Sequence, residues 1–272
     1  MQLLDILTIL LFVLGIVIIG LSFSNKGRNM KSFFAAGGAL PWSMSGLSLF
    51  MGFFSAGTFV VWGSIAYSLG WIAVSIQWTI AIAGFLVGYF IAPRWHNTGT
   101  LTVAEYIACR LGVYTQKVYT YLFLFISLFT TGSFLYPVAK IVEVSTGIPL
   151  ELCIVLLGGF CILYVATGGL WAVVSTDVLQ FVILTGAVLI VVPLALGRIG
   201  GIMGLIESAP SGFFNLVNGE YSIGFIIAFG VYNAIFLGGN WAYVQRYASV
   251  ASPSDARKVG FLFGGLYVIS AV

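Results

Sequence analysis

Charged residues are scarce in this chain. Only 7% of its 272 residues are Asp, Glu, Lys or Arg, whereas 60% are hydrophobic and 16% are aromatic. A soluble domain carries about a quarter charged residues, so this composition excludes a water-soluble enzyme. The net charge of +3, from 11 basic and 8 acidic side chains, is too weak and too scattered for binding nucleic acid. The composition predicts a membrane protein.

Histidine and cysteine are also rare, which limits the chemistry available to the chain. There is one histidine, His96, and three cysteines, Cys109, Cys153 and Cys161. Their spacings do not match the paired ligands of zinc or iron–sulfur sites. In an apolar run, small thiols such as Cys153 and Cys161 are ordinary packing residues. Neither a metalloenzyme nor a bound cofactor is expected.

Long uncharged runs make up most of the sequence. A helix that crosses a bilayer needs about 20 apolar residues. Seven such runs are predicted as spans, over residues 3–21, 41–67, 71–93, 118–144, 150–166, 170–196 and 223–243. The first lacks a basic start and a small-residue cleavage site, so it is predicted to be a retained helix. A further run, 259–272, is shorter than a span, which favours an N-terminal fragment of a longer protein.

The basic residues predict an orientation, because Lys and Arg accumulate in short cytoplasmic loops. Two basic residues, Lys140 and Arg198, fall on one side of the predicted spans. Nine fall on the other: Lys26, Arg28, Lys31, Arg94, Arg110, Lys117, Arg246, Arg257 and Lys258. The asymmetry predicts that the basic loops face the cytoplasm and that the N-terminus lies on the outer side of the cell membrane.

Two connections are long enough to hold helices of their own. In residues 97–112, Thr102 precedes Glu105 by three positions, which is the spacing of a capping box. This pattern predicts a short helix at the cytoplasmic surface of the membrane. The connection 200–219, interrupted by Pro210, is the expected counterpart on the outer side.

The second apolar run, SMSGLSLFMGFFSAGTF, carries a stripe of small and polar residues. Ser45, Ser48, Gly52, Ser55 and Thr58 recur three or four positions apart and therefore share one helical face. The spacing leaves two interpretations open. The stripe can serve close packing against another helix. Alternatively, the helix is interrupted around 52–57, and its freed carbonyls and hydroxyls coordinate a cation.

One acid lies inside the sixth run. An uncompensated acid at mid-bilayer costs about 2.5–3.5 kcal/mol on insertion scales, so Asp177 should face water, a cation or a hydrogen-bond donor. A donor such as the neighbouring Ser175 would be a structural explanation. A place on a cation path is the favoured hypothesis. Asp177 has no second in-membrane carboxylate beside it in the sequence, which argues against an intramembrane enzyme.

Other polar groups occur inside the third, fourth and seventh runs. Gln77 lies in the third run. Thr130 lies in a group of hydroxyls shortly before Pro137, which frees a backbone carbonyl if the run is helical. Asn240 follows two glycines that invite a break in the seventh run. The group of hydroxyls before Pro137 is a reasonable place for a solute to bind, and each of these signals is weak when taken alone.

Taken together, these segments resemble the sodium:solute symporter family, which includes sodium–glucose, sodium–proline and sodium–pantothenate carriers. The most specific segment is YVATGGLWAVVSTDVLQ at 164–180, which is similar to the family's Gly-Gly signature followed by Thr-Asp-x-x-Gln. Supporting segments are SFFAAGGALPWSMSGLSLF, GSIAYSLG, STGIPL and NWAYVQRYASVASPSDARK. The resemblance covers essentially the whole chain.

The resemblance implies an all-α polytopic membrane protein with a leucine-transporter-type core of two inverted five-helix repeats, present here as an N-terminal fragment. The implied division begins with an extra N-terminal helix in 1–24 and a cytoplasmic basic loop in 25–40. The first repeat then occupies 41–197, an outer loop 198–222, and the truncated start of the second repeat 223–272.

The implied activity is secondary-active, sodium-coupled symport of a small polar organic solute into the cell, with sodium as the coupling ion. The sodium ligands would be the backbone carbonyls of Met51 and Phe54, with Asp177 on the exit path. Further ligands would come from beyond Val272. By position in the family motifs, the solute contacts would be Ser55, Thr58, Gln77, Thr130 and Asn240, and the gate would be Tyr243.

The solute class stays open at this stage. Sugar-carrying members of the family typically have an acidic residue where Gln77 precedes Trp78 here. This departure argues against a sugar as the solute, and an amino acid, a monocarboxylate or another polar metabolite stays open. The alternative function is a membrane sensor with the same fold, joined to a downstream signalling domain. The sequence does not predict an oligomeric state.

Overall fold

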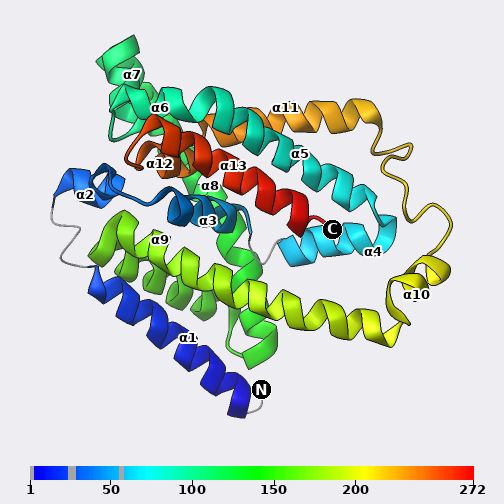
Figure 1. Ribbon diagram of the computed structural model, residues 1–272. Coiled ribbons are helices and arrows are strands. Elements are labelled where there is room, and N and C mark those ends of the chain that lie inside the picture. The colour runs from blue at the N-terminus through cyan, green and yellow to red at the C-terminus, as the bar shows by residue number, and fades with distance from the viewer. Residues whose placement is uncertain (1–2, 24–28, 55–57) are drawn as a thin grey trace.

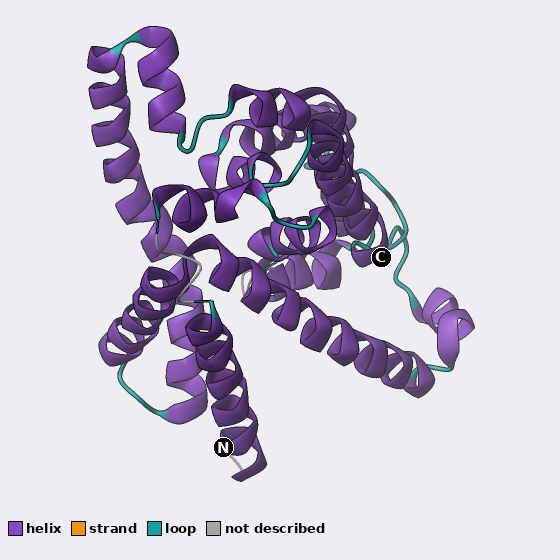
Figure 2. Ribbon diagram, turned by 60° about the vertical axis from the view of Figure 1, so that its left-hand side comes forward, coloured by secondary structure: helices purple, strands orange, loops and turns teal. Residues whose placement is uncertain are grey.

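The computed structural model describes residues 3–23, 29–54 and 58–272 (Figures 1 and 2). Within these ranges every regular element is a helix, and the one isolated bridge pairs Leu40 with Val250. The helices α2, α7 and α12 gather at one end of the bundle, and α4 and α10 lie at the opposite end (Figure 1). The ribbon coloured by secondary structure shows how little of the described chain is loop (Figure 2).

The first predicted span forms α1, Leu3–Ser22, which packs along α9. The segment after it forms α2, Met30–Ala35, and the 3₁₀ turn η2, Ala36–Gly38. This segment accepts hydrogen bonds from two helices that lie far from it in the sequence. The indole Nε1 of Trp171 donates to the Ala36 carbonyl at 3.2 Å, and the Gln245 amide donates to the Phe34 carbonyl at 2.5 Å.

The second predicted span is broken, as one of the two interpretations required. Its parts are α3, Trp42–Phe53, the π-helical turn η3, Thr58–Trp62, and α4, Gly63–Leu69. The two sides of the break are bent by 59°. Ser55, a candidate solute contact, lies outside the described residues. The seventh span is broken in the same way, because α11, Ile223–Gly239, and α12, Trp241–Ala248, meet at 60° around Asn240.

The third predicted span is continuous and closely packed. It consists of α5, Ile72–Leu86, the π-helical turn η4, Val87–Ile91, and α6, Ala92–Thr98. It lies against α11 and against α13, Pro253–Ser270. At the crossing with α13, a Cβ on Gly260 would sit 2.4 Å from the Gly88 Cα, so only glycine lets the two backbones approach this closely.

The next predicted spans are arranged more loosely. The short helix predicted from the capping-box spacing is present: Thr102 caps α7, Val103–Leu111, by accepting from the Glu105 amide at 3.1 Å. The long helix α8, Val113–Thr146, follows. Then α9, Leu150–Arg198, contains a break at Gly169, where φ is 57° and ψ is −150°. The break separates the predicted fifth and sixth spans, and a Cβ at Gly169 would lie 2.8 Å from the Phe33 carbonyl oxygen.

The connection after α9 contains α10, Gly201–Ser208, which ends before Pro210. By length and composition, three described helices could cross a membrane, or five if each bent pair is one span. The longest of them, α9, contains two predicted spans. The main core joins α3, α5, α12 and α13 around Phe50, Tyr247 and Phe263.

Candidate ion and solute site

The two broken helices meet beside the break in α3. The ring of Tyr243, in the first turn of α12, lies 4.3 Å from the ring of Phe53, at the last turn of α3. A Cβ on Gly52 would lie 3.5 Å from the same tyrosine ring. Tyr243 is buried. The predicted gate residue therefore packs on Gly52 and Phe53, which lie between the predicted ion ligands Met51 and Phe54 in the chain.

The backbone at the end of α3 leaves its normal hydrogen-bond pattern. The Phe54 amide is shared between the carbonyls of Phe50 and Met51, at 3.2 Å from each. Phe54 itself is extended, and the Thr58 hydroxyl donates to the Phe53 carbonyl at 3.3 Å. A carbonyl oxygen has two lone pairs, so Met51 keeps one for a ligand. This local geometry offers carbonyl oxygens, which suit a small hard cation.

A buried polar network links α3, the second half of α9 and α12. The Ser48 hydroxyl donates to Asp177 Oδ2 at 2.5 Å, and Arg246 Nε donates to the Ser48 oxygen at 3.2 Å. Arg246 Nη2 lies 3.7 Å from Asp177 Oδ2. Ser48 is fully buried, and the side chains of Asp177 and Arg246 are 15% and 12% exposed. The acid therefore has both a hydroxyl donor and a counter-charge.

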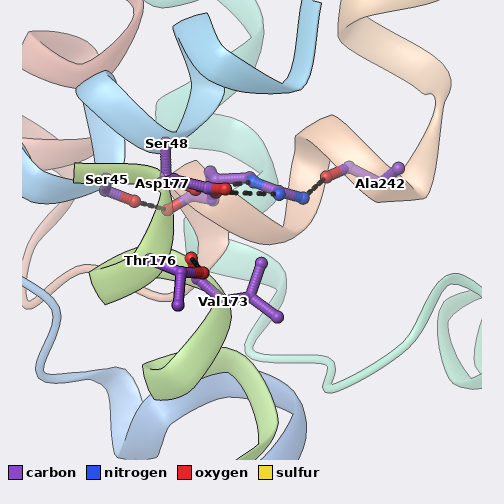
Figure 3. Close-up of polar contacts among 7 residues, drawn as sticks. Ser45, Ser48, Val173, Thr176, Asp177 and Ala242 are labelled. Carbon is purple, nitrogen blue, oxygen red and sulfur yellow. Dashed lines mark hydrogen bonds and ion pairs between the residues drawn. The ribbon is translucent and has the colours of Figure 1, made fainter. Parts of the chain in front are cut away.

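Figure 3 shows Ser48 and Asp177 pointing toward one another across the two helices. Ser45, one turn before Ser48, donates from its hydroxyl to the Arg246 carbonyl at 2.6 Å and so attaches the α12 backbone to α3. The small-residue stripe thus packs and carries polar contacts at the same time. The alternative donor for Asp177 was wrong: the Ser175 hydroxyl is buried and finds no partner among the described residues, and the donor is Ser48.

The other candidate residues lie in different settings. Gln77 is buried in α5, and its Oε1 has no hydrogen-bond partner among the described residues. Asn240 caps α12 by accepting from the Ala242 amide at 3.0 Å. Thr130 is exposed on α8, where its hydroxyl donates to carbonyls of its own helix. The structure does not bring Thr130 to the break in α3, because α8 packs mainly on α7 and α9.

The sequence profile of the sodium:solute symporter family matches residues 33–214 of the chain. The chain belongs to this family. A curated relative is the sodium/glucose cotransporter of Vibrio parahaemolyticus, 31% identical over 95% of this chain and 51% of the relative. Sodium/glucose cotransporter 1 of Ovis aries is also 31% identical, over 72% of this chain and 30% of its own length. The chain thus spans about half of the first relative and less than a third of the second, and both relatives are named as cotransporters.

The fold has also been seen in a solved structure. The chain of a Na⁺-coupled sialic acid symporter, in its substrate-bound outward-open state, superposes with a TM-score of 0.88 at 21% identity. The match covers 99% of this chain and 58% of that one. The all-α symporter fold expected from the sequence is confirmed, and sodium fits as the coupling ion of the family. Within the described residues there is no cluster of three His, Cys, Asp or Glu side chains that could hold a metal ion.

Sequence reasoning does not find one residue of the candidate site. The charge pattern places Arg246 among the basic loop residues, whereas the structure buries most of its side chain beside Asp177. A signal was present. Arg246 follows Tyr243 by three positions, so the two share one face of a short helix whose other members include apolar residues. An arginine that shares a helical face with a predicted gate residue is expected to be partly buried and not to lie in a solvated loop.

Proposed function

We propose that the whole protein is a sodium-coupled symporter that moves a small polar organic solute across the cell membrane by alternating access. The observation that carries the proposal is the meeting of two broken helices at Phe53 and Tyr243. Broken helices place free backbone groups at membrane depth, where they can bind ions and solutes. Family membership supplies the coupling ion.

The sodium site of this proposal is the end of α3. The carbonyls of Met51 and Phe54 lie where α3 stops, and the Met51 carbonyl keeps a lone pair beyond its bond to the Phe54 amide. Further ligands would come from parts of the whole transporter outside this chain. Asp177, a buried acid on α9, is proposed to lie on the path by which sodium leaves.

The solute would bind next to the ion, between the breaks. Gln77 is proposed as a solute contact, because its buried amide oxygen has no donor among the described residues and a hydroxyl or amine of the solute would supply one. Ser55, Thr58 and Asn240 stay predictions as further solute contacts. Thr130 also stays a prediction, and on the geometry of α8 it requires a state in which that helix lies nearer to α3.

Tyr243 is proposed as the gate on the inner side, because its ring covers the end of α3. The proposed orientation has the N-terminus outside, with α2, α7 and α12 at the cytoplasmic end. The basic residues Lys31 on α2 and Arg110 on α7 follow the charge rule for cytoplasmic segments. Lys26 and Arg28 lie outside the described residues.

Coupling follows if ion and solute favour the same conformations. A ligand with equal affinity for both states would shift nothing, so sodium must bind the outward-open state more tightly. Sodium at the end of α3 would fix the carbonyls and the neighbouring Phe53, against which Tyr243 packs. The membrane potential adds about 2.3 kcal/mol per charge per 100 mV to inward movement.

The test is uptake by the whole transporter reconstituted in liposomes, over sugars, amino acids and carboxylates, with and without a sodium gradient. We expect a sodium-dependent current with one solute class. In the same assay Gln77→Ala should raise the KM for that solute by about tenfold, the loss of roughly one buried hydrogen bond. Correctly inserted protein that transports no member of the panel would contradict symport and favour a sensor.

A further inference from the structure

The buried acid of the candidate site already has a cation beside it, and that cation belongs to the chain. Arg246 Nη2 lies 3.7 Å from Asp177 Oδ2, beyond hydrogen-bond distance. The Ser48 hydroxyl joins the two groups, because it accepts from Arg246 Nε and donates to the carboxylate. The ion pair is therefore close but not locked by direct hydrogen bonds, and its cationic partner can leave without breaking a bidentate contact.

The network has room for one positive charge at a time. A carboxylate buried in a membrane protein needs a counter-charge, and Arg246 supplies it here. A sodium ion on the same carboxylate would be a second positive charge within a few ångströms of the guanidinium. Like charges at this separation repel strongly where water is largely excluded. Sodium and the guanidinium therefore exclude each other at Asp177.

We propose that Arg246 is a tethered competitor of sodium at Asp177, and that its return to the carboxylate expels the ion toward the cytoplasm. This inference rests on the proposed function, because it requires sodium to move past Asp177. Arg246 thereby sets the affinity of the exit path for sodium. Without it, a buried carboxylate would hold the ion and slow its release.

The same residue connects ion release to helix movement. Arg246 lies on α12, the short helix after the second break, and its Nη1 donates to the Ala242 carbonyl of that helix. Its backbone carbonyl accepts from the Ser45 hydroxyl, so Arg246 makes two hydrogen bonds that join α12 to α3. When sodium displaces the guanidinium from Asp177, the side chain withdraws and its Nε contact with Ser48 is lost, whereas the backbone contact with Ser45 remains. The occupancy of Asp177 therefore biases the separation of α12 from α3.

The test measures sodium binding to the whole transporter purified in detergent, by titration of its tryptophan fluorescence. Arg246→Gln removes the competing charge, so we expect sodium to bind at least about tenfold more tightly and to be released more slowly from proteoliposomes. Arg246→Lys keeps the charge but loses the Nε contact with Ser48, and should shift the affinity less, in the same direction. Arg257→Gln is the matched control, because Arg257 lies over the Tyr89 ring, 5.0 Å from its centroid.

The Asp177→Asn background separates competition from a structural role. In that background Arg246→Gln should not change sodium affinity further, because the shared carboxylate is gone. A structural role would instead weaken sodium and solute binding together, and would persist with Asp177→Asn. Unchanged or weaker sodium affinity in folded Arg246→Gln, or in Arg246→Lys if only that variant folds, would overturn the inference. A wild-type protein without sodium dependence would overturn the proposed function itself.

Discussion

Two long helices of the chain are equally apolar, but they are used in opposite ways. The continuous span α5 to α6, Ile72–Thr98, and the helix α8, Val113–Thr146, have the same mean hydropathy over their most apolar stretch. In the first, 56% of that stretch is buried inside the described structure, and in the second only 6%. Hydropathy therefore identifies both as candidates for the membrane. It does not say which one packs on protein.

Small residues explain the difference. Gly84 and Gly88 in α5 and η4 meet Gly260 and Gly264 in α13, and each pair of glycines is four residues apart. This spacing lets two helices approach at backbone distance. In α8, a Cβ on Gly132 would meet nothing within 4 Å. The packed helix is thus recognised by where its glycines meet those of another helix, and not by how apolar it is.

The largest effect is expected where the glycines cross. Gly88→Leu places a side chain against the Gly260 backbone, 3.0 Å away at its Cβ alone, so the helices must separate. Overpacking of this kind costs about 1–3 kcal/mol and often more. Gly132→Leu in α8 should be neutral or stabilising, because leucine favours a helix over glycine by roughly 0.8 kcal/mol.

The measurement is the free energy of unfolding of each purified variant in detergent micelles, by denaturant titration. If the two variants lose the same stability, backbone approach at this crossing does not distinguish α5 from α8. The comparison would then have to be explained by side-chain volume alone.

A second pair of variants compares a tyrosine hydroxyl in the packed core with one on the exposed helix α8. Tyr247 is fully buried, and its hydroxyl donates to the Leu237 carbonyl at 2.6 Å, in the last turn of α11 before the break. Tyr247→Phe leaves that carbonyl without its donor and should cost about 1–2 kcal/mol. Tyr121 on α8 is 73% exposed, so Tyr121→Phe should cost almost nothing. Equal unfolding free energies for the two variants would show that the break at Asn240 does not depend on this bond.

Local patterns in the sequence predicted much of the fold. The capping box at Thr102, the glycine break at Gly169 and the interruption after Gly52 each depend on residues a few positions apart. Asp177 was found because an acid in an apolar run is costly on its own. These features need no knowledge of the partner helix.

The partners of those residues could not be predicted in the same way. The donor to Asp177 is Ser48, 129 residues away, whereas local sequence suggests the nearer Ser175. Arg246 lies 198 residues from Ser48, and the rule that places arginine in cytoplasmic loops does not predict their contact. The family motifs predict Thr130 as a solute contact, yet Thr130 is exposed on α8 in this structure. Which helix lies against which is decided by packing, and hydropathy carries little of that information.

The smallest effect concerns acids at two helix starts. Asp255 lies in the first turn of α13, where Lys258 donates to it at 2.9 Å and Ser252 donates at 2.8 Å. These donors, Lys258 first, hold the pKa of Asp255 below its usual value. A lowered pKa means that the ionised form stabilises the fold at neutral pH, and that this contribution is lost as the pH falls through the lowered value.

Asp255→Asn should therefore lower the unfolding midpoint slightly at pH 7, and the gap to wild type should close as the solution becomes acidic. The matched variant is Glu151→Gln, at an exposed position in the first turn of the loosely packed α9. Midpoints are measured from pH 7 downward past the ordinary carboxyl pKa of about 3.9, where the loss of this contribution begins. A gap for Asp255→Asn that does not change with pH would mean that packing of the side chain at the start of α13, and not its charge, distinguishes this helix from α9.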